Sequence, residues 1–398
     1  MSAPDPSAVD ALRRDVRGWL ERALDPGWRT RMTGATTAEF VAFQREWMHS
    51  LVAAGYATPH WQAGWPGGGR SLAEQRVIAE EMARADAPRL MLYFVSLYHA
   101  ALTLMEWGSE AQKARHLPAI LQGEVWCQGF SEPNAGSDLA SLRTRAERHG
   151  SVYRVNGQKI WSTLAHHADY CLLLVRTDTS GPKQAGISFL LMDMRSKGVT
   201  VRPIRQITGD EEFGEIFLDD VEVPVSNRLG AENEGWRVAQ TTLTSERGIT
   251  ILELSERLHH ARRRLAALLA GDDGRGGDDQ YRRELVQVCA RIEALRGLVA
   301  ELMAEIESGQ ASIAKAAFVK LFYARVLREF TDLALRAAGP DAQRLAPLVL
   351  AGGHETGNWM ADYMNSFVWS IAGGSNEIQR NIIAERVLGM PRDAAVAR

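Results

Sequence analysis

The segment VYRVNGQKIWST, residues 152–163, decides the fold, because it opens a series of short β-prone runs in a chain that is otherwise helical in pattern. Further runs, each bounded by Gly, Pro, Asp or Thr, follow at 170–177, 186–194, 198–204 and 215–223. No helical pattern alternates with these runs, which argues against a doubly wound parallel sheet and favours a compact antiparallel barrel or sandwich. Within the first run, Asn156-Gly157 predicts a tight hairpin turn.

The segment before this β-region carries the periodicity of amphipathic helices. Ser71 and Glu74 have the spacing of a capping box, which predicts that a helix starts there. Farther upstream, apolar residues recur at intervals of three and four, at Phe40, Phe43, Trp47 and Leu51. One apolar stripe on a helix is therefore expected in this part.

The segment after the β-region is also helical in pattern. Residues 236–270 predict a long amphipathic helix that ends at the acidic, Gly-rich stretch 271–279. Three more helices are expected, and a four-helix bundle would bury their apolar stripes together; they span 280–308, 310–338 and 354–388. The predicted fold has three domains, namely an N-terminal α-helical domain (1–125), a middle antiparallel β domain (126–234) and a C-terminal four-helix bundle (235–398).

Composition narrows the classes of function. The chain has 398 residues and a formal net charge of −3, so neither nucleic acid nor an anionic membrane is expected as its main partner. No run approaches the roughly 18 apolar residues of a membrane span, and the first ten residues lack the pattern of a secretion signal. Three cysteines without a Cys-x-x-Cys motif favour a reducing compartment over a disulfide framework or a zinc site. We expect a soluble, cytoplasmic protein.

Three motifs resemble signatures of the acyl-CoA dehydrogenase family. They read SEPNAGSDLASLRTRA from Ser131, KIWSTLAHHADY from Lys159 and GGSNEIQRNIIAERVLGMPR from Gly373. The resemblance covers nearly the whole chain and implies the same order of helical, β and helical domains. It also implies an enzyme that removes an α-proton and a β-hydride from a coenzyme A thioester. FAD would be the cofactor and an electron-transfer flavoprotein the acceptor.

The resemblance assigns the cofactor contacts mostly to small residues. The main chain of Phe130 and the side chain of Ser131 would bond the pyrimidine edge of the flavin. Gly136 and Ser137 would lie near the pyrophosphate, where small side chains let backbone N–H groups approach phosphate. The other implied cofactor residues, of which the first packs on the flavin ring, are Trp161, Ser162, Thr163, Gly374 and Ser375. Without the resemblance, each of these residues is more simply explained as part of the core or of a turn.

The chemistry also needs a base, because the α-proton of a thioester is only weakly acidic and a partly desolvated carboxylate suits its removal. Many family members carry this Glu just before the C-terminal signature, but here that position is Gly373. A minority keep it on the first helix of the last domain, in the pattern Leu-x-x-Glu-Arg, which this chain has at 243–247. The resemblance therefore implies Glu246 as the base, with Ser137, Arg247 and Gly373 near the substrate. The alternative is an ordinary glutamate on a helix surface.

Two family motifs that reach a neighbouring subunit's FAD are absent. The acidic stretch 271–279 replaces Arg-x-x-Phe-Gly, and residues 336–340, RAAGP, replace Gln-x-x-Gly-Gly. Because the contacts to the chain's own FAD are kept, we predict an α2β2 heterotetramer with a related acyl-CoA dehydrogenase chain, with a homo-oligomer as the alternative. Two other functions remain open, a non-catalytic subunit that shares the FAD site and a flavin oxidase that reduces oxygen.

Overall fold

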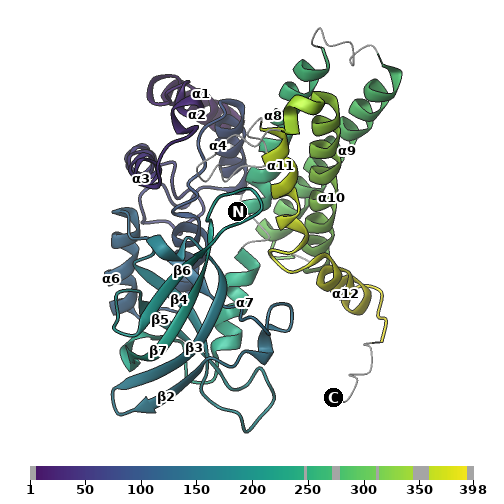
Figure 1. Cartoon of the computed structure of the whole chain (residues 1–398). Coiled ribbons are helices and arrows are strands. Elements are labelled where there is room, and N and C mark those ends of the chain that lie inside the picture. The colour runs from purple at the N-terminus through teal and green to yellow at the C-terminus, as the bar shows by residue number, and fades with distance from the viewer. Residues whose placement is uncertain (1–5, 246–248, 271–277, 311–312, 344–357, 392–398) are drawn as a thin grey trace.

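The computed structural model describes residues 6–245, 249–270, 278–310, 313–343 and 358–391. Figure 1 shows a group of N-terminal helices, a middle β-sheet beneath them, and a group of long C-terminal helices standing beside both. This arrangement confirms the predicted order of a helical, an antiparallel β and a second helical domain. In the ranges described, no helix is long and apolar enough to cross a membrane.

The N-terminal helices form where caps and apolar stripes predict them. The predicted capping box is present, since the Ser71 hydroxyl accepts from the backbone N–H of Glu74 at the start of α4. The stripe on α3 buries Phe40, Trp47 and Leu51 in the main core. The helices of this part are α1 (Pro6–Ala23), α2 (Trp28–Met32), α3 (Thr37–Ala54), α4 (Leu72–Arg84), the π-helix η1 (Val95–Ala100), α5 (Ala101–Trp107) and α6 (Glu110–Leu121).

The middle domain is one sheet in the order β6-β7-β3-β2-β4-β5-β8, with β1 added beside β4. Most pairs are antiparallel, but β1 runs parallel to β4. Successive residues of β4 point to opposite faces of the sheet and enter two cores. Leu172 and Leu174 belong to the core shared with the N-terminal helices, while Leu173 and Val175 belong to a second core formed by residues of the β domain. The strands are β1 (Trp126–Gly129), β2 (Arg145–His149), β3 (Val152–Thr163), β4 (Tyr170–Arg176), β5 (Ile187–Asp193), β6 (Val199–Ile204), β7 (Phe213–Pro224) and β8 (Arg228–Leu229).

The predicted hairpin turn at Asn156-Gly157 is wrong. Both residues lie inside β3, and the turn between β2 and β3 falls earlier, at Gly150. A register shift against β7 occurs between Val155 and Gly157, which marks a bulge in the strand. Glycine is needed there because a Cβ atom at Gly157 would lie only 2.5 Å from the hydroxyl oxygen of Thr144.

The C-terminal helices bury their apolar stripes in a separate core. The helix expected over 354–388 is interrupted in the described part, because Gly373 and Gly374 both have positive φ (65° and 89°) and end the helical run. The elements are α7 (Gly235–Ser245), α8 (Ile249–Leu269), α9 (Asp279–Glu307), α10 (Ile313–Ala338), η6 (Pro340–Gln343), α11 (Trp359–Ser366), η7 (Val368–Ser370) and α12 (Asn376–Arg386).

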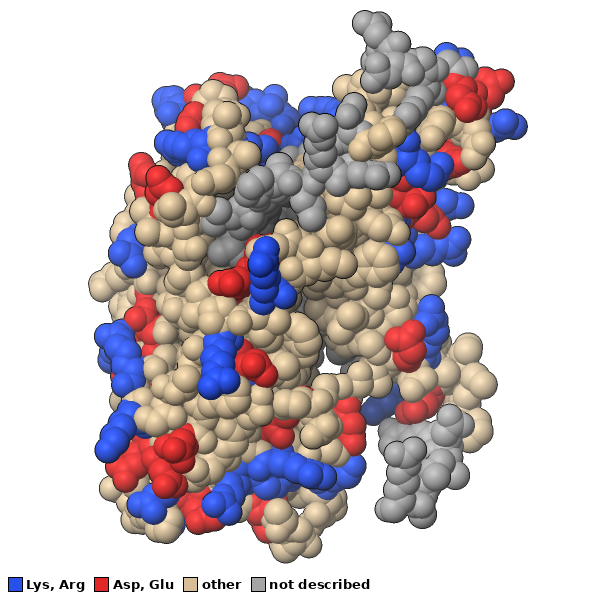
Figure 2. Space-filling view, in the orientation of Figure 1, with Lys and Arg blue, Asp and Glu red and all other residues tan. Residues whose placement is uncertain are grey.

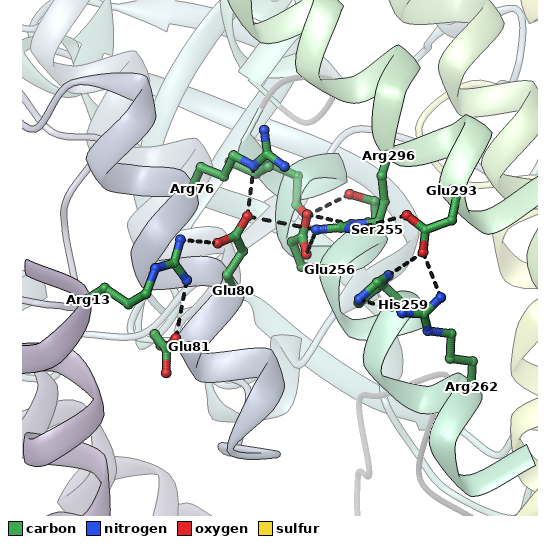
Figure 3. A network of polar contacts seen from close by, with 11 residues as sticks. Arg13, Arg76, Glu80, Glu81, Ser255, Glu256, His259, Arg262, Glu293 and Arg296 are labelled. Carbon is green, nitrogen blue, oxygen red and sulfur yellow. Dashed lines mark hydrogen bonds and ion pairs between the residues drawn. The ribbon is translucent and has the colours of Figure 1, made fainter. Parts of the chain in front are cut away.

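A network of ion pairs joins the two helical domains (Figure 3). Arg296 on α9 forms a bidentate pair with Glu256 on α8, with N···O distances of 3.0 and 2.9 Å, and Glu256 is buried. Arg296 also approaches Glu80 of α4 at 3.8 Å, and Glu80 in turn pairs with Arg13 of α1 at 2.6 Å. The network therefore connects α1 and α4 to α8 and α9, and it helps to set how the C-terminal helices stand against the rest of the molecule.

Candidate functional site

The end of strand β3 presents an aromatic ring in a strained backbone conformation. Trp161 has a φ of 62° and its residue surface is 56% exposed, although most large apolar side chains of this domain are buried. A register shift against β7 occurs between Lys159 and Ser162, so the strand bulges where Trp161 turns outward. The Trp161 ring makes an edge contact with the ring of Phe213, at 6.0 Å between centroids. Strain of this kind in a non-glycine residue is concentrated at functional sites.

The neighbouring hydroxyl has no partner among the described residues. Ser162 is fully buried, and its Oγ makes no hydrogen bond within the described residues. A buried polar atom without a partner costs free energy, and because Ser162 is fully buried its hydroxyl is not part of the exposed face around Trp161. Thr163, next in the strand, is half-buried.

A buried ion pair fixes this strand to the loop that follows β1. The Nζ atom of Lys159 lies 2.9 Å from Oε1 of Glu132 and 3.1 Å from the carbonyl oxygen of Phe130. The Glu132 carboxylate also accepts from the backbone N–H groups of Arg143 and Thr144. Burial opposes its ionisation, but Lys159 and Thr144 outweigh that effect and hold the pKa of Glu132 below its usual value. Neither Lys159 nor Glu132 was predicted as a site residue from the sequence. A lysine at an inward-facing position of a β-strand was a signal that could have identified the buried pair.

The loop after β1 lies directly beside Trp161. The backbone N–H of Ile160 donates to the carbonyl of Ser131 at 2.9 Å, which brings the first and second motifs together. Phe130 is buried with its ring edge against Phe189, whereas Ser131 is half-exposed. Gly136 and Ser137 are exposed, and a Cβ atom at Gly136 would meet no other atom within 4 Å. The predicted cofactor residues of this loop therefore border open space.

The third motif forms a turn held by side chains of the C-terminal helices. Gln379 donates through Nε2 to the carbonyls of Gly373 and Gly374, and Lys320 donates to the carbonyl of Gly374 at 2.7 Å. Ser375 caps α12 by accepting from a backbone N–H of that helix. In Figure 1 the turn leads into α12 across from α7 and the β domain, and Figure 2 shows the surface hollowed between these parts.

The predicted base and the residue after it fall in a gap between two described helices. Glu246 and Arg247 lie outside the described residues, between the end of α7 at Ser245 and the start of α8 at Ile249. Most of the acidic stretch 271–279 lies outside them as well. Among the described residues, no group of three or more His, Cys, Asp or Glu side chains could hold a metal ion.

The sequence matches three family profiles that together follow the three parts of the fold. These are the acyl-CoA dehydrogenase N-terminal domain at residues 7–124, the middle domain at 127–221 and the C-terminal domain at 233–388. The acyl-CoA dehydrogenase IpdE1 of Mycolicibacterium smegmatis is 39% identical and covers 97% of this chain and 98% of its own length. A cyclohexane-1-carbonyl-CoA dehydrogenase of Geobacter metallireducens is 29% identical, over 78% of this chain and 80% of its own.

Two solved structures have the same fold over nearly the whole chain. The Tcur3481-Tcur3483 steroid ACAD superposes with a TM-score of 0.85 at 31% identity, covering 99% of this chain and all of the other. The ChsE4-ChsE5 complex from Mycobacterium tuberculosis gives a TM-score of 0.80 at 30% identity, covering 98% of this chain and all of the other. Fold, motif order and full-length similarity all lead to one conclusion: this chain belongs to the acyl-CoA dehydrogenase family of FAD-dependent oxidoreductases that act on CH–CH bonds.

Proposed function

We propose that this chain binds FAD and performs the α,β-dehydrogenation of an acyl-CoA thioester. The observation that carries the proposal is the end of β3, where the strained and exposed Trp161 lies beside the loop after β1 that holds the exposed Gly136 and Ser137. A flat aromatic cofactor that carries phosphates fits such a surface, because it covers the indole and the small exposed residues let backbone N–H groups approach its phosphates. FAD, when bound, accepts the hydride that leaves the β-carbon of the substrate.

The residues of this chain would hold and orient the cofactor. Trp161 packs against the ring system, while the main chain of Phe130 and the hydroxyl of Ser131 bond its pyrimidine edge. The Lys159–Glu132 pair keeps this loop and the strand in register, with Nζ and Oε1 2.9 Å apart. Thr163 offers a hydroxyl near the reactive edge. The remaining cofactor contacts fall to Ser162, Gly136, Ser137, Gly374 and Ser375.

Proton removal is assigned to Glu246 on sequence grounds. Its carboxylate takes the α-proton, and the backbone N–H of Gly373 donates to the thioester oxygen, where negative charge develops. Gly373 lacks a side chain and so leaves space for a bulky acyl group, and Arg247, the next residue after the base in the sequence, is assigned to substrate binding on the same sequence grounds. Ser137 contributes a hydroxyl near the same cleft.

A related subunit would complete the cofactor site. Arg336, the first residue of the replaced Gln-x-x-Gly-Gly motif, is held within this chain by ion pairs with Glu284 and Asp332. It is therefore poorly suited to reach a neighbour's cofactor. Two structural relatives are complexes of two differently named chains. We propose an α2β2 assembly with a related acyl-CoA dehydrogenase chain, and an electron-transfer flavoprotein as the acceptor.

The test is anaerobic titration of the flavin-loaded protein with a panel of acyl-CoA thioesters, using this chain alone and together with a related chain encoded beside it. Bleaching of the flavin reports the half-reaction directly. Glu246→Gln should keep FAD but slow bleaching by several orders of magnitude, because the amide cannot accept the proton. Glu106→Gln, the same change at an exposed carboxylate, should leave the rate unchanged.

Other outcomes identify the rivals. If the pair of chains bleaches normally with Glu246→Gln, the chain is a non-catalytic subunit that shares the FAD site. If reduced flavin is reoxidised by oxygen as fast as by an electron-transfer flavoprotein, it is an oxidase. A stoichiometrically flavinylated and active homo-oligomer would contradict the heteromer.

A further inference from the structure

Two buried side chains hold the glycine turn of the third motif, and no step proposed above uses them. Lys320 on α10 and Gln379 on α12 are 5% and 0% exposed. The Lys320 ammonium donates to the carbonyl oxygen of Gly374 at 2.7 Å. The side-chain nitrogen of Gln379 donates to the carbonyls of Gly373 and Gly374 at 2.9 and 3.3 Å. Lysine is rarely buried to this extent unless its charge is paired or hydrogen-bonded, so this contact indicates a specific role.

The turn needs such support because its own residues do not restrict it. Gly373 and Gly374 have φ values of 65° and 89°. Glycine reaches positive and negative φ about equally easily, so two glycines in succession leave many conformations open to the chain. The hydrogen bonds from Lys320 and Gln379 select one of these conformations. The shape of the turn is therefore set by side chains of α10 and α12.

The chain ahead of the turn is held by the same helix. Tyr323 lies about one helical turn after Lys320 on α10 and is buried. Its ring meets the ring of Trp369 edge-on, with centroids 5.3 Å apart and planes at 88°. Trp369 belongs to η7, shortly before the turn, and Figure 1 shows α12 beside the lower end of α10. Helix α10 therefore fixes both the entry to the turn and the turn itself.

The bound carbonyls determine where the neighbouring N–H groups point. In a trans peptide the C=O bond and the following N–H bond point in opposite directions. Because the carbonyls of Gly373 and Gly374 face Lys320 and Gln379, the N–H groups of Gly374 and Ser375 point away from these two side chains. None of the N–H groups of residues 373–375 donates to an acceptor within the described residues. Successive N–H groups in such a turn attract negative charge, so they can serve a ligand oxygen.

We infer that Lys320 is a positioning residue of the dehydrogenation, which together with Gln379 presets the Gly373–Gly374 turn for the thioester oxygen. The inference rests on the proposed function, in which the N–H of Gly373 donates to that oxygen. Donors that are fixed before the reaction need no reorientation when negative charge develops, and this preorganisation raises the rate. A charged donor holds a carbonyl more strongly than a neutral one does. The alternative is that Lys320 only stabilises the helical domain.

The first measurement separates the rate of flavin reduction from substrate binding. Anaerobic stopped-flow on the assembled holoenzyme gives the reduction rate at saturation and the dissociation constant of an acyl-CoA thioester. Lys320→Met should slow reduction by about 10- to 100-fold and change the dissociation constant by less than about threefold, because the oxyanion develops only in the transition state. Lys320→Arg keeps a charged donor and should recover most of the rate. Lys315→Met is the matched control on α10, since Lys315 pairs with Glu305 near the surface, and it should keep the full rate.

The second measurement isolates the oxyanion from hydride transfer. A thioester with a ketone at the β-carbon has a more acidic α-proton and no β-hydride to lose, so it ionises in the site without reducing the flavin. Absorbance of the bound enolate, followed across pH, gives the midpoint of its ionisation. In Lys320→Met this midpoint should rise by about one pH unit, which is a tenfold loss of enolate stabilisation. Gln379→Met removes no charge and should shift the midpoint in the same direction, which separates the geometry of the turn from the charge of Lys320.

Flavin content and melting temperature show whether each variant is folded. If Lys320→Met does not fold, Gln379→Met takes its place in both measurements. An unchanged reduction rate and midpoint in the folded variant would overturn the inference and leave the dehydrogenase function intact. A loss of flavin and melting temperature that Lys320→Arg does not restore would also overturn it, because Lys320 would then be structural. If no thioester bleaches the wild-type flavin, the proposed function fails and the inference fails with it.

Discussion

The Nζ atom of Lys159 lies 2.9 Å from the Oε1 atom of Glu132, and neither side chain is more than 9% exposed. This pair joins strand β3 to the loop after β1, so the two segments that carry most of the predicted flavin contacts are held by one buried interaction. A buried pair of this kind contributes less net stability than its short distance suggests, because both charges lose their hydration. Its main effect is to fix geometry, and breaking it leaves one charge without compensation.

Lys159→Met is therefore expected to lower the free energy of unfolding by about 3–5 kcal/mol, since it leaves Glu132 buried and unpaired. Flavin content should fall with it, because the Phe130 carbonyl loses its donor at the same time. Chemical denaturation of the apoprotein measures the first effect and absorbance of the purified protein the second. Lys183→Met is the control, since its pair with Asp138 is more than half exposed and should contribute no more than about 1 kcal/mol. An equal loss in both variants would contradict the account.

Trp161→Gly should separate cofactor binding from stability. The positive φ of 62° is unfavourable for tryptophan and accessible to glycine, and such strain costs on the order of 1 kcal/mol. The apoprotein should therefore be as stable as the wild type, or more stable by up to about 1 kcal/mol, in thermal unfolding. FAD affinity, measured by fluorescence titration, should fall at least tenfold. Trp161→Phe keeps a ring and should lose less affinity; a parallel loss of stability and affinity in Trp161→Gly would show that the residue is structural.

Glu81 on α4 makes stability depend on pH. Burial alone would raise its pKa, but Arg17, Arg84 and Arg13, at 2.8, 2.6 and 3.2 Å, outweigh burial and lower the pKa to about 2 (Figure 3 shows the pair with Arg13). Because the folded-state pKa lies below that of the unfolded chain, the contribution is fully present above about pH 4.5. It is lost as the pH falls towards 2.

Glu81→Gln should accordingly lower the free energy of unfolding at pH 7 by on the order of 2 kcal/mol, with a difference from wild type that shrinks between pH 4.5 and 2. Urea denaturation across this range measures it. Glu110→Gln, at an exposed position whose carboxylate pairs with Lys113 on the same helix, should show no such pH dependence. A constant difference at all pH values would show that Glu81 acts through packing instead of charge.

Local sequence signals predicted those features that depend on local chemistry. The capping box at Ser71 and the buried stripe on α3 follow from spacing along one helix, and the structure has both. The prediction failed at Asn156-Gly157, where a turn signal lies inside a strand. The close approach of Thr144 to Gly157, a contact between residues distant in sequence, decides the outcome there.

The sequence by itself determined the family and the order of the domains, and it supplied the small residues of the proposed cofactor site, because motifs and periodicity are properties of neighbouring residues. Only the tertiary structure decided that Lys159 pairs with Glu132 and that Cys127 lies opposite Cys171. The physical reason is that burial and pairing depend on which distant segments are packed together. Burying a charge costs free energy unless the charge is paired, and whether a residue is buried depends on segments that are distant in the sequence.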